Sequence, residues 1–154
     1  MTIVAGGQTG VDRAALDAAR SLGLDVAGWC PRGRRAEDGP IPMHYPLRET
    51  STAFYIHRTR LNVRDSDATL MLVLGRIHGG TALTADFARR MAKPCHVVNL
   101  LTTPQPDAAT RAWLNTHRPL RLNIAGPRAS QGDAVYARGF EYCSCLLAAL
   151  VYSG

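Results

Sequence analysis

The chain has 154 residues, 46% of them hydrophobic and 19% charged, which predicts a single soluble domain with its own core over residues 1–154. No apolar run approaches the roughly 20 residues of a membrane span, and no signal peptide precedes the first predicted strand, so we expect a cytoplasmic protein. The net charge is +6, but aromatic residues are only 6% of the chain and scattered, so we expect a small anionic partner rather than nucleic acid or a membrane.

A glycine-rich turn joins the first predicted strand, around residues 2–5, to the first predicted helix, around residues 11–22. Backbone N–H groups at such a turn are free, and the positive end of the helix dipole lies beside them, so phosphate or another oxyanion is the natural guest. A tight corner that binds nothing is the alternative, but two adjacent glycines and a third nearby exceed what a corner needs. The ligand-binding candidates here are Gly6, Gly7, Gln8, Thr9 and Gly10.

The second predicted strand covers residues 24–29, and a long loop over residues 32–40 follows it. The loop carries three arginines within four residues and leaves the carboxyl end of a strand, the edge where open α/β sheets place ligands. Arg34 and Arg35 are therefore candidate counter-charges for an anion, the alternative being a solvated excursion. A dinucleotide-binding fold usually has an acid near the end of this strand. Arg32 stands there instead, which argues against an NAD site.

A predicted helix and a predicted central strand come next. Ser51 or Thr52 is placed to cap a helix that runs to about Val63, and Arg58 lies on its partly apolar face as either a surface residue or a ligand clamp. Residues 68–74 form an almost unbroken apolar run, which is typical of a strand buried on both faces. This strand is therefore predicted at the centre of a parallel sheet.

A second strand–glycine–helix unit begins where that central strand ends. The glycines open a helix that runs through Met91, and two threonines place hydroxyls near its start, although capping alone would explain them. Two anion-accepting turns on neighbouring central strands would face one crevice, which is the strongest indication of a ligand site in the sequence. The candidates from this unit are Gly79, Gly80, Thr81 and Thr84.

The rest of the chain completes an alternating pattern. Strands over residues 95–100 and 120–125, with a helix between them, precede a last, apolar helix over residues 134–151, which either covers the sheet or faces another subunit. The alternation predicts a Rossmann-like α/β fold, a doubly wound parallel sheet of about five or six strands with helices on both faces. Gly126 and Arg128 follow the last strand and join the candidates, while dispersed Cys and His residues predict no metal site.

Several distinctive blocks follow one another along the chain. They are Gly6-Gly7-Gln8-Thr9-Gly10-Val11-Asp12-Arg13, Gly28-Trp29-Cys30-Pro31, Gly33-Arg34-Arg35-Ala36-Glu37-Asp38-Gly39, Arg58-Thr59, Asn62-Val63, Asp65-Ser66-Asp67-Ala68-Thr69 and His78-Gly79-Gly80-Thr81. Together they resemble the "putative molybdenum carrier" family over nearly the whole chain. Those proteins are similar to the Rossmann-like molybdenum cofactor carrier of algae, a homotetramer, and are grouped with circularly permuted members of the SLOG superfamily, whose ligands are nucleotide-like. The resemblance implies the molybdenum cofactor (molybdopterin) as bound ligand and a homo-oligomer, a dimer or tetramer.

The chain also resembles the Lonely Guy-type phosphoribohydrolases, with one departure. Arg58 lies nine residues before Asp67, as their active-site arginine lies before the aspartate of the next strand, and the second glycine turn resembles part of their glycine-rich block. Their catalytic glutamate has no counterpart, since the nearby positions are Thr84, Ala85 and Asp86. We therefore expect a non-enzymatic carrier without catalytic residues, which grips phosphate or oxometal oxygens at its glycine turns.

Two alternatives to the carrier stay open at this stage. One is a SLOG-type sensor that binds a nucleotide-derived ligand in the same pocket. The other is a nucleoside-monophosphate phosphoribohydrolase that relies on Arg58 and on a shifted Asp86. The position of Asp86 tests the enzyme hypothesis, which fails if this side chain is directed away from the glycine turns. Pterins and purines are both flat, hydrogen-bonding rings, and no residue of the sequence separates them.

Overall fold

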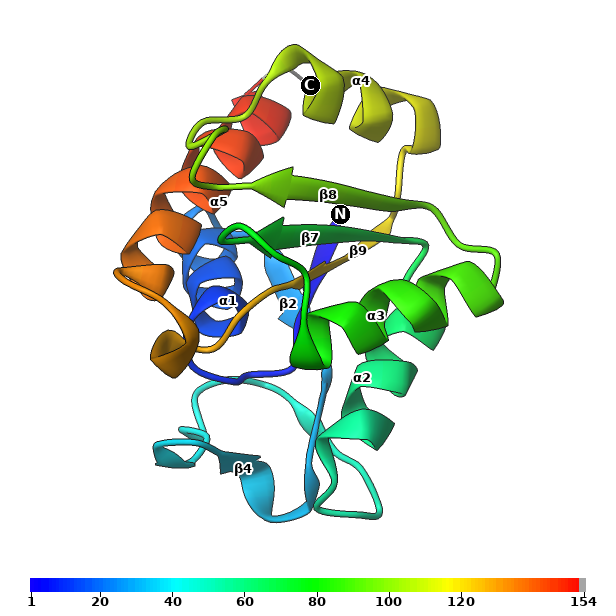
Figure 1. The fold of residues 1–154 in the computed structure, drawn as a ribbon, viewed down its shortest axis with the longest axis vertical. Helices are drawn as coiled ribbons and strands as arrows, with labels where there is room; N and C mark the ends of the chain where they lie inside the picture. Colours follow the sequence, from blue (N-terminus) through cyan, green and yellow to red (C-terminus); the bar gives the residue numbers. More distant parts are fainter. Residues whose placement is uncertain (153–154) are drawn as a thin grey trace.

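The structure, a computed structural model, describes residues 1–152 as a five-stranded parallel sheet flanked by helices (Figure 1). From edge to edge, the strands are β2 (Asp25–Ala27), β1 (Thr2–Val4), β9 (Arg121–Ala125), β7 (Ala68–Val73) and β8 (Cys95–Asn99). All neighbouring strands of this sheet pair in parallel. The predicted Rossmann-like α/β fold is therefore confirmed.

Helices cover both faces of the sheet. On one face, α1 (Val11–Ser21) packs against α5 (Val135–Tyr152); on the other, α2 (Tyr55–Arg64) packs against α3 (Gly79–Arg90) (Figure 1). The fifth helix, α4 (Ala108–His117), lies beside β8. The main core forms where α1, α4 and α5 meet apolar side chains of β7 and β9. Because side chains alternate along a strand, the intervening residues of β7 and β9 face α2 and α3.

The last helix covers the sheet instead of standing away from it. Tyr142, Leu146 and Leu147 of α5 are at most 1% exposed and belong to the main core. Gly139 lets the helix approach α1 closely, since a Cβ there would lie 3.2 Å from the Cβ of Ala14. The apolar face of α5 is thus accounted for within the chain.

The order of the strands corrects one prediction. The two glycine turns were expected on neighbouring strands, but β9 lies between β1 and β7, with Asn123 opposite both Val4 and Thr69. The strand that comes last in the sequence therefore occupies the centre of the sheet. Its short apolar run resembles those of the other strands, so the local pattern contains no sign of this central place.

The second predicted strand is in fact two strands. β2 ends at Ala27, and β3 (Trp29–Cys30) leaves the main sheet to pair with β6 (Arg48–Glu49). Gly28 separates them at φ 149°, where a Cβ would lie 2.0 Å from the carbonyl oxygen of Ala5. Only glycine fits so close to the neighbouring backbone, and the chain changes direction there.

The arginine-rich loop is a folded excursion. It contains a 3₁₀ turn (Arg32–Arg34) and a small hairpin of β4 (Arg35–Ala36) and β5 (Gly39–Pro40). Ile41, Tyr45 and Leu47 are nearly buried and form a second, smaller apolar cluster against α1. Residues 32–50, the excursion from here on, thus pack onto Ala5 and Leu16 of the main domain through a small apolar cluster.

Helix α2 begins later than predicted. Its first residue is Tyr55, and Phe54 stands at the N-cap position without a side-chain hydrogen bond, so neither Ser51 nor Thr52 caps it. The carbonyl of Thr52 accepts the N–H of Arg32 at 2.8 Å, and its hydroxyl pairs with His57 at 3.0 Å. Thr52 therefore closes the excursion instead of starting the helix.

The four cysteines are all free thiols, with Cys30 and Cys143 buried, Cys95 half-buried and Cys145 exposed. Within residues 1–152, three or more Cys, His, Asp or Glu side chains nowhere come together as a metal site would require. No helix in the same range is both long and apolar enough to span a membrane.

Candidate functional site

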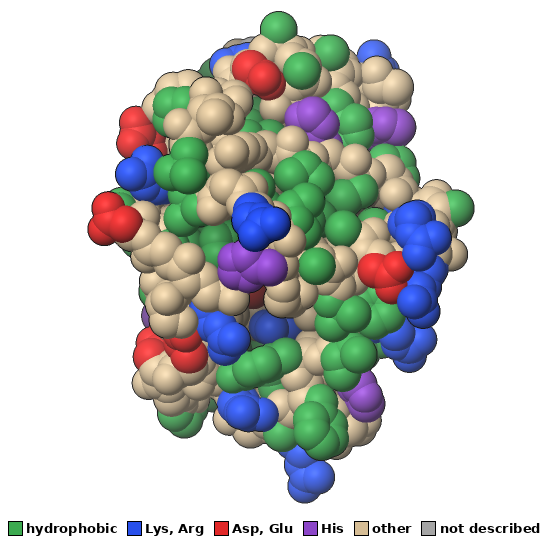
Figure 2. Space-filling view, in the orientation of Figure 1, with side chains coloured by type: hydrophobic (Ala, Val, Ile, Leu, Met, Phe, Trp, Pro, Cys, Tyr) green, Lys and Arg blue, Asp and Glu red, His purple; other side chains and the backbone are tan. Residues whose placement is uncertain are grey.

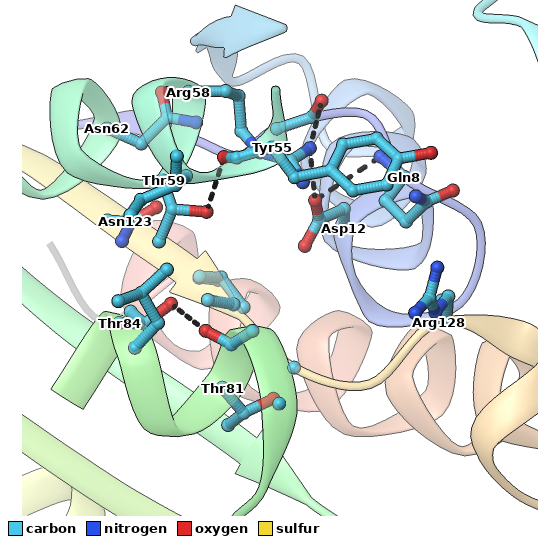
Figure 3. A pocket seen from close by; sticks show the side chains of 18 of the residues that line it. Gln8, Asp12, Tyr55, Arg58, Thr59, Asn62, Thr81, Thr84, Asn123 and Arg128 are labelled. Atoms are coloured by element: carbon cyan, nitrogen blue, oxygen red, sulfur yellow. Dashed lines mark hydrogen bonds and ion pairs between the residues drawn. The ribbon is translucent and has the colours of Figure 1, made fainter. Parts of the chain in front are cut away.

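A pocket of about 270 Å³ opens at the carboxyl ends of β1, β9 and β7, between the sheet, α2 and α3 (Figure 3). It is lined by Gly6, Gln8, Asp12, Tyr55, Ile56, Arg58, Thr59, Asn62, Gly79, Gly80, Thr81, Leu83, Thr84, Asn123, Ile124, Ala125, Gly126, Arg128 and Gln131. Both predicted glycine turns contribute to the lining, because the turns after β1 and β7 meet across the end of β9. Figure 2 shows basic side chains at a hollow on the face that carries α3, with hydrophobic side chains beside it.

The start of α3 supplies free backbone donors to the pocket. Gly79, Gly80 and Thr81 are its first three residues, and within the described part of the chain no side chain caps this helix. Gly79 has φ 57°, a left-handed conformation that suits glycine, and the Thr84 hydroxyl donates to the Gly80 carbonyl at 2.9 Å. Uncapped N–H groups at the positive end of a helix favour an anion.

Arg58 is the buried cation of the pocket. Arg58 is only 8% exposed, and its Nη1 donates a hydrogen bond to the carbonyl of Gly6 at 3.0 Å. A Cβ on residue 6 would lie 2.4 Å from Nη1, so glycine at this position makes room for the guanidinium. The guanidinium also lies over the ring of Tyr55, 5.3 Å from its centroid. Arg58 is therefore held in place by backbone and aromatic contacts that leave further N–H donors available.

Asp12 faces Arg58 across the pocket floor. Its Oδ2 accepts the Gln8 N–H at 3.3 Å and lies 3.7 Å from Arg58 Nη1, a distance for charge attraction but not for a hydrogen bond. Burial raises the pKa of the Asp12 carboxyl above its ordinary value of 3.8, and the charge of Arg58 with the amides of Gln8 and Gly6 offsets only part of this effect.

Backbone amides of the first glycine turn already have acceptors within the chain, including the Asp12 carboxylate. Gln8 N–H donates to Asp12, Val11 N–H donates to the carbonyl of Pro127 at 3.1 Å, and Thr9 N–H donates to Gln8 Oε1 at 3.1 Å. These amides are therefore unavailable to a phosphate. Of the two predicted anion-accepting turns, the one at α3 keeps its donors free.

Uncharged polar side chains form the other end of the pocket. Asn123 is 2% exposed on β9 and donates to the hydroxyl of Thr69 at 3.2 Å. Asn62 holds the backbone of Trp29 through both its amide oxygen and its amide nitrogen. Thr59 and Thr84 complete this end, and the labelled side chains lie as two groups on either side of the Arg58–Asp12 pair (Figure 3).

The structure places five of the predicted site residues outside the pocket lining: Gly7, Thr9, Gly10, Arg34 and Arg35. Arg34 is buried, and its guanidinium donates to the carbonyls of four residues of the excursion, Ile41, Pro42, Tyr45 and Leu47. Arg35 lies over the Tyr55 ring, with its Cζ 4.8 Å from the ring centroid. Gly7 and Gly10 abut Leu47 and the Pro127 carbonyl, respectively.

Thr9 and Arg128 lie beside a carboxylate that attaches the excursion to the body of the domain. Glu37 accepts hydrogen bonds from the hydroxyl of Thr9 and from Ser130, and Arg128 Nε lies 3.8 Å from its Oε2. Burial pushes the pKa of Glu37 upward, but the hydrogen bonds from Ser130 and Thr9 and the charge of Arg128 outweigh it, so the pKa is lowered. Arg128 thus both lines the pocket and faces this attachment point.

Sequence reasoning did not single out several lining residues, including Asp12, Tyr55, Asn62, Asn123 and Gln131. The signal for Asn123 is an amide between two apolar residues of a strand, Leu122 and Ile124. Such a residue must find a polar partner on the buried face. Asp12 stood within the first glycine-rich block but was given no role.

Asp86, the proposed substitute for the missing glutamate, is not among the lining residues. Its carboxylate pairs with Arg89 at 2.7 Å and with Arg90 at 2.8 Å on the outer side of α3. These pairs lower the pKa of Asp86, chiefly through the hydrogen bond from Arg89. The hydrolase hypothesis that relied on Asp86 therefore loses its carboxylate.

A polar pocket at the carboxyl ends of central parallel strands defines a small-ligand-binding α/β domain. The chain belongs to the circularly permutated YpsA SLOG family, whose model matches residues 3–147. It is similar to the crystal structure, at 1.45 Å resolution, of a "Putative molybdenum carrier protein" from Syntrophus aciditrophicus SB. The identity is 43% and the TM-score 0.89, over 95% of this chain and 94% of that chain. The comparison with curated proteins gave no match. The family resemblance expected from the sequence blocks is thus confirmed.

Proposed function

We propose that the pocket binds a phosphorylated heterocycle and that the protein carries the molybdenum cofactor. The observation that supports this most is the distribution of polar groups in the pocket. Free amides at the start of α3, together with Arg128, suit a phosphate, whereas Arg58, Asn123, Thr59 and Thr84 suit a hydrogen-bonding ring. The name of the related crystal structure supports molybdenum as part of the cargo.

The size of the pocket also bears on the ligand. Its volume of about 270 Å³ lies just below the range of about 300–1,000 Å³ that is typical of ligand pockets. A single ring system with one phosphate fits such a space better than a dinucleotide does. A nucleotide-derived signal in a SLOG-type sensor is the second candidate, because the lining offers nitrogen and oxygen groups that suit purine and pterin equally.

Native mass spectrometry of the protein purified from its own host, with metal analysis of the same sample, tests the carrier. We expect a bound species with molybdenum in near-stoichiometric amount, on a dimer or tetramer. A bound nucleotide without metal would contradict the carrier and support the sensor.

Two arginines of α2 provide a matched pair of variants for this experiment. Arg58→Gln removes the buried cation of the pocket, so we expect occupancy to fall about tenfold or more, the usual effect of losing a charged hydrogen bond. Arg60→Gln changes an exposed residue of the same helix outside the lining, and occupancy should stay as in the wild type. Equal occupancy in both variants would remove Arg58 from the site.

A further inference from the structure

The pocket contains a buried acceptor that needs donors from the ligand. Asp12 is the one acidic side chain among the residues that line the pocket, and it is 8% exposed. A carboxylate offers about four acceptor directions. The amides of Gln8 and Gly6 take at most two of them, and Arg58 at 3.7 Å is too distant for a hydrogen bond. Acceptor capacity therefore remains on the side of the pocket, toward which Asp12 points (Figure 3).

A donor lies next to this acceptor and is held in place by backbone and aromatic contacts. Arg58 uses Nη1 to hold the carbonyl of Gly6, and a guanidinium has five N–H donors in total. The Tyr55 ring packs against that guanidinium and lines the same part of the pocket. An acceptor and a donor side by side match the edge of a planar ring that carries N–H groups and a carbonyl oxygen.

We propose that Asp12 selects rings with a 2-amino-4-oxo edge, the edge that pterins and guanine share, over adenine. This inference rests on the proposed function, since it concerns the heterocycle of the same ligand. The ring N–H and the amino group donate to the Asp12 carboxylate, and the ring carbonyl accepts from Arg58. Adenine presents a ring nitrogen lone pair at the corresponding place, and this lone pair would face a carboxylate oxygen.

The sequence leaves open whether the ligand is a pterin or a purine. On this inference, the hydrogen-bonding edge of the ring decides which ligands bind tightly. Sites built to hydrogen-bond a substrate group reject analogues without it strongly, because the buried partner is left unpaired. Asp12 has this property, since it is buried whether or not a ligand is present. Inosine, which lacks the 2-amino group, should therefore bind less tightly than guanosine in the same phosphorylated form.

Isothermal titration of the full chain with GMP, IMP, AMP and neopterin monophosphate tests this inference. We expect GMP to bind about tenfold or more tightly than AMP, with IMP between them. Neopterin monophosphate should bind as tightly as GMP or more tightly. The ratio of the two affinities separates a pterin ligand from a guanine nucleotide. Asp12→Asn should bring GMP and AMP to within about threefold of each other. Asp17→Asn, a change of the same kind on α1 outside the lining, should leave the preference intact.

The outcomes separate this inference from the function on which it rests. If AMP binds the wild type as tightly as GMP, or if Asp12→Asn keeps the full preference, the role of Asp12 is overturned while a phosphorylated ligand still stands. If none of the four compounds binds the wild type, both proposals fail. If Asp12→Asn does not fold, the order of GMP, IMP and AMP on the wild type decides alone.

Discussion

At the scale of single residues, Asp12 accepts a backbone hydrogen bond but, when ionised, lowers the stability of the ligand-free protein. Its pKa is raised, so the folded state holds the proton more firmly than the unfolded state does. The loss of stability from ionised Asp12 is therefore complete above its raised pKa and disappears as the pH falls from that pKa to the ordinary value of 3.8. A buried charge kept under these conditions is typical of a functional site.

This sign leads to a prediction for Asp12→Asn. Because the amide is uncharged, we expect the melting temperature of the ligand-free variant at pH 7 to equal or exceed that of the wild type, although ligand selectivity is lost. Differential scanning calorimetry at pH 7 and pH 5 measures it, and the gap between the two proteins should narrow at the lower pH. A variant that melts well below the wild type at pH 7 would make Asp12 a purely structural residue.

The arginines show which residue roles could be predicted from the sequence. Arg58 lines the pocket as expected, whereas Arg34 holds four carbonyls of its own excursion. Both are buried, although only Arg34 has a glycine beside it in the sequence. What separates them is the chain segment that each guanidinium reaches, and this is a property of tertiary structure that local pattern does not contain.

At the scale of elements, the Glu37 carboxylate is one of the groups that attach the excursion to the domain, beside the Arg13–Asp38 ion pair. Its pKa is lowered in the folded state, so its contribution to stability is present above the unfolded value near 4.5 and is lost as the pH falls below it. Protonation removes the charge that faces Arg128 and weakens acceptance from Thr9 and Ser130. The excursion should then loosen before the sheet does.

Hydrogen exchange of residues 36–45 across a pH series measures this loosening. We expect protection in the wild type to fall below about pH 4.5, relative to Glu37→Gln, in which the carboxylate is absent at every pH. Protection in the strands of the main sheet should stay unchanged over the same range. A constant ratio between wild type and variant at all pH values would show that the charge of Glu37 does not hold the excursion.

Elements with strong local signals were predictable, and their arrangement was less so. The apolar runs of β7 and β8 and the long apolar stretch of α5 appear close to their expected positions. Two features were missed: the break at Gly28 and the central place of β9. The first follows from a close contact with Ala5 and the second from pairing with β1 and β7, so both depend on residues distant in the sequence.

At the scale of the whole molecule, β9 joins two halves of the sheet that do not otherwise pair. β1 and β7 each hydrogen-bond to β9, which lies between them. The buried side chains Leu122 and Ile124 fill the core on the α1 and α5 face. Removing this strand would expose the inner edges of both β1 and β7.

We therefore expect a chain that ends after residue 119 to lose cooperative folding. Without β9 and α5, the sheet is left as two separate strand pairs, β2–β1 and β7–β8, with little shared core. Denaturant unfolding followed by circular dichroism should therefore show no sharp transition. A peptide of residues 120–152, added in excess, should restore part of the transition by inserting into the gap. A cooperative transition in the truncated chain alone would mean that β9 is dispensable.

The central place of β9 also determines when the pocket can bind a ligand. Wall residues of the pocket come from both ends of the chain, from Gly6 to Gln131, and its floor includes Asn123 of the last strand. During synthesis the ribosome must therefore release the chain through at least Gln131 before the pocket is complete. Ligand binding is thus a separate event that follows the folding of the last strand into the sheet.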